Sequence, residues 1–164
     1  MHQSFPHLLT MKTQGPSNGY TYLLRYSKDL DGQTCATRTG PDRPIELHPR
    51  VPELVDVQGW AVCRRNDEQH YQVLDPTNYA GKQYGLSASR DPGLQESVVL
   101  GSKPSEFRFI PEKEQGKYII CLSGPTTGVY KCLDVLNNQL VIRSFPEGHI
   151  WDDLPRWYLD PIAG

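Results

Sequence analysis

The sequence has 164 residues, a net charge of −2 and a mean hydropathy of −0.56. This length suits one domain with a core of its own, and no apolar run approaches the roughly 18 residues of a membrane helix. Because the chain has no long basic run, we expect neither nucleic acid nor a membrane among its partners.

The start of the chain differs in composition from the rest. Residues 1–19 are mostly polar and include Gly15, Pro16 and Gly19, so we expect a flexible arm ahead of one domain over residues 20–164. The arm lacks the charged-then-apolar order of a signal peptide, which favours a cytoplasmic protein.

Twelve strand-like segments follow the arm, separated by turns rich in glycine, proline, asparagine and aspartate. In chain order they are residues 22–24, 35–37, 44–47, 60–62, 71–74, 84–86, 97–100, 107–109, 118–120, 130–132, 139–142 and 157–159. The twelve segments form three sets of four, and the first and last members of each set share a residue pattern. A tyrosine opens each set of four, and Trp60, Phe107 or Trp157 begins its last member.

Three recurring sets of four strands predict the fold. No single set has a two-sided core, so the three must bury their inner faces together. A closed barrel also removes exposed strand edges. We therefore predict an all-β protein of β-trefoil type, with twelve strands in three pseudo-symmetric four-strand repeats.

The four cysteines are Cys35, Cys63, Cys121 and Cys132. They show no CxxC spacing and are too few for a disulfide scaffold. We expect free, mostly buried thiols, with one bridge between Cys121 and Cys132 as the alternative.

Motifs that carry catalytic chemistry are not found in the sequence. The five histidines form no HExxH pair, and no GxSxG elbow or Walker loop occurs. The adjacent Asp152 and Asp153 fit a solvated turn better than an acid–base pair. We therefore predict a protein that is not an enzyme and that uses no cofactor or metal.

One short motif indicates a different function. Residues 58–60, Gln-Gly-Trp, fit the Gln-x-Trp pattern of sugar-binding trefoils. The equivalent triplets at residues 105–107 and 155–157 do not fit it, so a carbohydrate-binding lectin remains the alternative.

From about Gly19 onward the chain resembles the fungal β-trefoil protease inhibitors of the mycocypin type (clitocypin and macrocypin) and the related cospin-like serine protease inhibitors. The match depends on the order of short fragments, namely residues 19–20, 36–37, 43–49, 60–62, 65–67, 71–73, 84–87, 118–120, 145–146 and 155–157. The four cysteines depart from the family, which is generally cysteine-poor.

The resemblance implies that two loops block papain-like cysteine proteases. The first covers residues 27–33 and has at its tip Asp29, Leu30, Asp31 and Gly32. The second covers residues 49–58 and includes Val51, Pro52, Glu53, Leu54 and Val55.

The resemblance also implies other target proteases. Asn78 falls within one residue of the position where the family presents an asparagine to legumain, in a loop that we expect over residues 75–82. Some relatives carry a basic residue in that same loop and inhibit trypsin-like enzymes, so Lys82 is a possible trypsin-reactive residue. Cospin-like inhibitors instead use the loop after the second strand, so Arg38 and Arg43 are further possible trypsin-reactive residues. We expect a monomeric defence protein whose partners are its target proteases.

Overall fold

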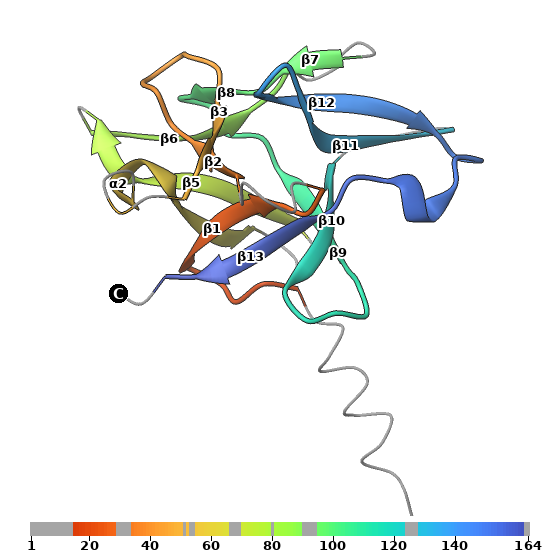
Figure 1. Ribbon diagram of the computed structural model, residues 1–164. Coiled ribbons are helices and arrows are strands. Elements are labelled where there is room, and N and C mark those ends of the chain that lie inside the picture. The colour runs from red at the N-terminus through yellow and green to blue at the C-terminus, as the bar shows by residue number, and fades with distance from the viewer. Residues whose placement is uncertain are drawn as a thin grey trace, which may run out of the picture.

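The structure is a computed structural model that describes residues 15–28, 34–50, 52, 55–65, 70–79, 81–89, 95–123 and 128–162. These ranges contain thirteen β-strands, one short α-helix, α2 (Val55–Gln58), and one 3-10 turn, η2 (Trp151–Asp153) (Figure 1). The strands are β1 (Tyr20–Tyr26), β2 (Thr34–Thr37), β3 (Glu46–Pro49), β4 (Gly59–Arg65), β5 (His70–Tyr79), β6 (Lys82–Ser87), β7 (Gln95–Ser97), β8 (Val99–Gly101), β9 (Phe107–Pro111), β10 (Lys117–Leu122), β11 (Val129–Leu136), β12 (Gln139–Pro146) and β13 (Trp157–Pro161).

Each of the twelve predicted segments overlaps a strand, which confirms an all-β protein. One segment differs in detail, because residues 97–100 are divided between β7 and β8, which pair with β12 and β6 respectively. No helix in the described ranges is long and apolar enough to cross a membrane.

The antiparallel pairings close into a barrel. Within the described residues nine strands form the ring β11–β12–β3–β2–β1–β4–β5–β9–β10 and return to β11. Strand β13 pairs with both β1 and β10, which also closes a shorter ring of six strands. Strands β6, β7 and β8 lie at the periphery.

Large aromatic side chains fill the barrel. Trp60, Phe107 and Trp157 are fully buried. The indole Nε1 of Trp60 donates to the Ala36 carbonyl at 3.0 Å, and that of Trp157 donates to the Leu133 carbonyl at 3.0 Å. Both bonds satisfy an N–H that would be costly to bury without a partner.

The main chains of three residues form a closed triangle of hydrogen bonds. The amide of Ile45 donates to the Val98 carbonyl at 3.0 Å, that of Val98 to Leu140 at 2.9 Å, and that of Leu140 back to Ile45 at 2.9 Å. All three side chains are fully buried. The triangle therefore joins three segments that are far apart in the sequence.

The end of the predicted arm contacts the barrel. The amide of Gly19 donates to the Val62 carbonyl at 2.8 Å, and the amide of Ser17 donates to the hydroxyl of Tyr22 at 3.1 Å. Residues 15–19 are thus held against β1 and β4, while residues 1–14 of the predicted arm lie outside the described part of the chain.

Candidate protease-binding loops

The connection between β2 and β3 is an exposed loop with a fixed backbone. The amide of Arg43 donates to the Gly40 carbonyl at 3.2 Å, which closes a β-turn with Pro41 and Asp42 at its centre. Asp42 has a φ of 64°, and a proline followed by a positive φ is typical of a type II turn.

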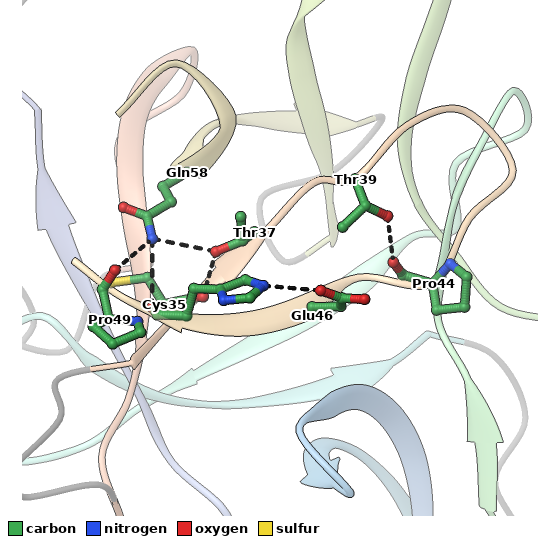
Figure 2. Close-up of polar contacts among 8 residues, drawn as sticks. Cys35, Thr37, Thr39, Pro44, Glu46, Pro49 and Gln58 are labelled. Atoms are coloured by element: carbon green, nitrogen blue, oxygen red, sulfur yellow. Dashed lines mark hydrogen bonds and ion pairs between the residues drawn. The ribbon is translucent and has the colours of Figure 1, made fainter. Parts of the chain in front are cut away.

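The same loop is bonded to strand β8. The amide of Asp42 donates to the Leu100 carbonyl at 2.6 Å, and the amide of Leu100 donates to the Arg43 carbonyl at 3.0 Å. The Thr39 hydroxyl donates to the Pro44 carbonyl at 3.1 Å across the base of the loop (Figure 2). The side chains of Thr39, Pro41, Asp42 and Arg43 are exposed. The backbone conformation of this loop is therefore fixed before any partner binds.

A second connection, between β3 and β4, is anchored by the buried side chain of Gln58. Its Nε2 donates to the Thr37 hydroxyl at 3.2 Å and to the Pro49 carbonyl at 3.1 Å (Figure 2). It also lies 3.4 Å from the His48 carbonyl. Gln58 ends α2, so one side chain ties the end of this connection to its beginning.

Arg38 fastens the same connection from the other side. Its guanidinium donates to the carbonyls of Asp56 and Gly59, stacks 4.8 Å from the centre of the Trp60 ring, and lies 3.2 Å from the Asp75 carboxylate. Arg38 is only 5% exposed.

This burial corrects one sequence-based interpretation. Arg38 was a possible trypsin-reactive residue, but its side chain is inside the protein, paired with a buried carboxylate. To enter a protease pocket, Arg38 would have to break its ion pair with Asp75 and its hydrogen bonds to two carbonyl groups. Arg38 is therefore no longer a candidate, and Arg43 is the remaining candidate in this loop.

The two loops predicted for papain-like proteases are only partly described. Asp29, Leu30, Asp31, Gly32, Val51, Glu53 and Leu54 lie outside the described residues, as does the side chain of Val55. Pro52 is described and exposed. The loop boundaries agree with expectation, because β1 ends at Tyr26, β2 begins at Thr34, and β3 and β4 flank residues 50–58.

The predicted legumain loop is shorter than expected. Strand β5 continues to Tyr79, and Asn78 is paired with Gln83 of β6. The register shifts between Leu74 and Asn78, so the irregularity expected over residues 75–82 is a bulge followed by a tight hairpin. Lys82 is exposed at the start of β6.

Sequence reasoning missed the buried charged residues Arg38, Asp75 and Arg156. Arg38 follows β2, Arg156 precedes β13, and Asp75 lies in the irregular part of β5 between Leu74 and Asn78. Charged residues are usually solvated, and no local sequence pattern marks these three as buried. Among the described residues no group of three or more metal-binding side chains is found.

A scan against protein-family models and a search of the curated proteins both found no match to this sequence. The functional argument therefore depends on the residues and their geometry.

Proposed function

We propose that the barrel is a β-trefoil. The shorter ring of β1, β4, β5, β9, β10 and β13 supports this, because it takes two strands from each predicted repeat. The hydrogen-bond triangle of Ile45, Val98 and Leu140 takes one residue from each repeat. The matching indole bonds of Trp60 and Trp157 support the same threefold relation.

We further propose that the protein inhibits proteases by inserting pre-shaped loops into their clefts. The observation that carries this proposal is the β2–β3 loop, which is fixed by an internal turn and by main-chain bonds to β8 and exposes the side chains of Thr39, Pro41, Asp42 and Arg43. A loop held in its bound shape loses little conformational entropy on docking, so more of the contact energy appears as affinity.

Arg43 is the proposed anchor of this loop. It is exposed at the end of the turn, and the primary pocket of trypsin-like enzymes carries an aspartate that receives an arginine side chain. The next residue is Pro44, whose nitrogen carries no hydrogen. We expect the loop to block the cleft while the Arg43–Pro44 bond stays intact.

Papain-like cysteine proteases are the second target class. The anchoring of the β3–β4 connection by Gln58 and Arg38 favours them, because this connection is the one that the mycocypin resemblance assigns to papain-like clefts. Under this proposal the exposed Pro52 belongs to the surface that contacts papain-like proteases. Legumain would bind at a different site, the loop that contains Asn78.

The proposal predicts which arginine controls inhibition of trypsin. Replacing Arg43 by alanine should raise the inhibition constant at least about 100-fold, as expected for an anchor residue worth about 3 kcal/mol. Arg43→Lys should keep most of the inhibition. The measurement is titration of trypsin with the purified protein and a peptide substrate.

Arg64 provides the matched control, because it is an exposed arginine on β4, away from the β2–β3 loop. Arg64→Ala should leave the inhibition constant unchanged. Equal effects of the two substitutions would contradict the role of Arg43. Mass spectrometry after long incubation checks that the chain is not cleaved after Arg43.

Papain, legumain and a glycan array complete the assay panel. Papain inhibition that weakens on Gln58→Ala would support the β3–β4 connection as a binding loop, and Asn78→Ala should affect legumain alone. Strong glycan binding by a protein inactive against all three proteases would replace the proposal by the lectin alternative.

A further inference from the structure

The connection between β12 and β13 presents two large apolar side chains to solvent. Ile150 is 66% exposed and Trp151 is 41% exposed. They precede and begin η2, and no sequence motif pointed to them. Exposed aromatic residues at the tip of a loop are typical anchors of protein contacts.

The backbone of this connection is fixed by its own hydrogen bonds. The amide of Asp153 donates to the Ile150 carbonyl at 3.0 Å, and that of Leu154 donates to the Trp151 carbonyl at 3.2 Å. The amide of Glu147 donates to the Gly128 carbonyl at 3.1 Å. Leu154 is 1% exposed and packs into a second core cluster, so the loop is attached at its start and its end.

A buried arginine fastens this connection, as Arg38 fastens the β3–β4 connection. Nη1 of Arg156 donates to the carbonyls of Leu154 at 2.7 Å and Asp152 at 3.1 Å, and its Nε donates to Glu112 at 2.6 Å. Arg156 is 8% exposed. In both loops, then, a carboxylate-paired arginine bonds to one carbonyl group within a short helical turn and to one just after it.

The ring of Trp151 is also held in place. It meets the ring of Tyr130 edge to face, with centroids 5.9 Å apart and planes at 80°. This contact limits the rotamers of Trp151 in the free protein. Less side-chain entropy is therefore lost when a partner receives the exposed part of the indole.

Carboxylates flank the apolar tip in the sequence. Glu147, Asp152 and Asp153 are exposed on the same connection, whereas its one arginine, Arg156, is buried and paired with Glu112. The neighbouring strands add the half-buried Lys131 of β11 and the exposed Arg143 of β12, which stacks on Phe145. The tip therefore fits a partner that combines an apolar pocket with a basic rim.

We propose that the β12–β13 connection is a second protease-binding loop, in which Trp151 enters the hydrophobic primary pocket of a chymotrypsin-like serine protease with a basic rim. Such enzymes have a hydrophobic slot where trypsin has its aspartate. Since residues 151–153 form a helical turn, the loop fills the slot without offering an extended bond for cleavage.

This loop is separate from the loops of the proposed function. Figure 1 shows the connection between β12 and β13 on the opposite side of the molecule from α2. One molecule can then hold two proteases at once. The inference shares with the proposed function only the class of partner, and it uses neither Arg43 nor the β3–β4 connection.

The test is inhibition of α-chymotrypsin by the full chain, with a peptide substrate. Trp151→Ala should raise the inhibition constant at least about 30-fold, whereas Trp151→Phe should stay within about fivefold of the parent, because an aromatic ring still fills the slot. Leu136→Ala is the matched control, since Leu136 is a 38% exposed apolar side chain on β11, and it should have no effect.

Protein saturated with trypsin should still inhibit chymotrypsin, and light scattering on a sizing column should show a complex of all three proteins. The inference is overturned if chymotrypsin is not inhibited, if Trp151→Ala behaves like Leu136→Ala, or if Trp151 instead mediates self-association. If trypsin is inhibited through Arg43 and chymotrypsin is not inhibited, this inference alone is contradicted.

If chymotrypsin is inhibited through Trp151 and trypsin is not inhibited, only the role of Arg43 is contradicted.

Discussion

At the scale of single residues, buried polar side chains shape the loops of this protein. Arg38, Gln58 and Arg156 each donate to main-chain carbonyls of a connection between strands. Carbonyl groups in a loop have no ladder partner, and a buried donor supplies one. The β3–β4 and β12–β13 connections therefore depend on side chains that are themselves buried.

Replacing Arg38 by methionine tests this dependence. The change leaves the Asp75 carboxylate, which is fully buried, without its cation, so we expect the free energy of unfolding to fall by about 3–5 kcal/mol. Urea unfolding of the variant and the parent measures it. Arg43→Met, on the exposed loop, should cost about 0.5 kcal/mol or less.

A double variant separates the ion pair from simple loss of packing. Because Asp75→Asn removes the charge that Arg38 neutralises, the double change Arg38→Met with Asp75→Asn should be less destabilising than the sum of the two single changes. Strict additivity would show that the two side chains do not interact.

At the scale of elements, aromatic and aliphatic periodicity was sufficient to predict the strands. Tyr71 and Trp60, for example, begin predicted strands, and both are buried in the strands that the structure shows. The division of the seventh predicted strand was not foreseeable, because Val98 bonds to Leu140 and Ile45 instead of to a ladder neighbour. Contacts between residues so far apart in the sequence leave no local pattern.

The candidate site was predicted less well than the strands. The position of the β2–β3 loop and the exposure of Arg43 agree with expectation. Arg38, five residues earlier in the same polar segment, could not be distinguished from Arg43 by its neighbours in the sequence. Its burial depends on Asp75 of β5, which is far from Arg38 in the sequence.

A pair of neighbouring strands also brings two thiols together. Cys121 of β10 lies opposite Cys132 of β11, and their sulfur atoms are 3.7 Å apart in the buried second cluster. Both thiols are free. The hydrogen bond between the two thiols lowers the pKa of Cys121, whereas the same bond, together with burial, raises the pKa of Cys132.

Mild oxidation should join these two thiols in the folded protein. We expect treatment with hydrogen peroxide to remove two hydrogens as the disulfide forms and to raise the free energy of unfolding by about 2–3 kcal/mol, because the closed loop is short. Mass spectrometry of peptides identifies the bond. In Cys121→Ser the bond should be missing, and a disulfide that forms only in urea would contradict the prediction.

At the scale of the whole molecule, the closed barrel buries groups that ionise in alkali. Burial raises the pKa of Cys35 to about 11 and that of Tyr118 to about 12. It also raises the pKa of Tyr26, with a further contribution from the hydrogen bond to Asp134. The folded state therefore holds these protons at pH values where the unfolded chain releases them.

These raised pKa values make the folded state less stable in alkali. The stability from Cys35 is fully present below pH 9.0, its ordinary pKa, and that from Tyr118 below pH 10.0. Both contributions are lost as the pH rises through the folded pKa values, so the free energy of unfolding should decline from about pH 9 to about pH 12.

Tyr118→Phe should make this decline less steep by up to about 1.4 kcal/mol per pH unit between about pH 10 and 12. Urea unfolding at a series of pH values measures the slope. An unchanged slope would show that Tyr118 ionises equally well in the folded protein.

The pairing of β1 with β13 has a consequence for the order of the chain. Tyr22 lies opposite Pro161 and Leu24 opposite Leu159, so the first and last described strands are side by side. A short linker could join them, and the backbone could then be reopened at another turn without removing a single strand pairing. The architecture is in this sense circular, and a circularly permuted gene would encode the same set of contacts.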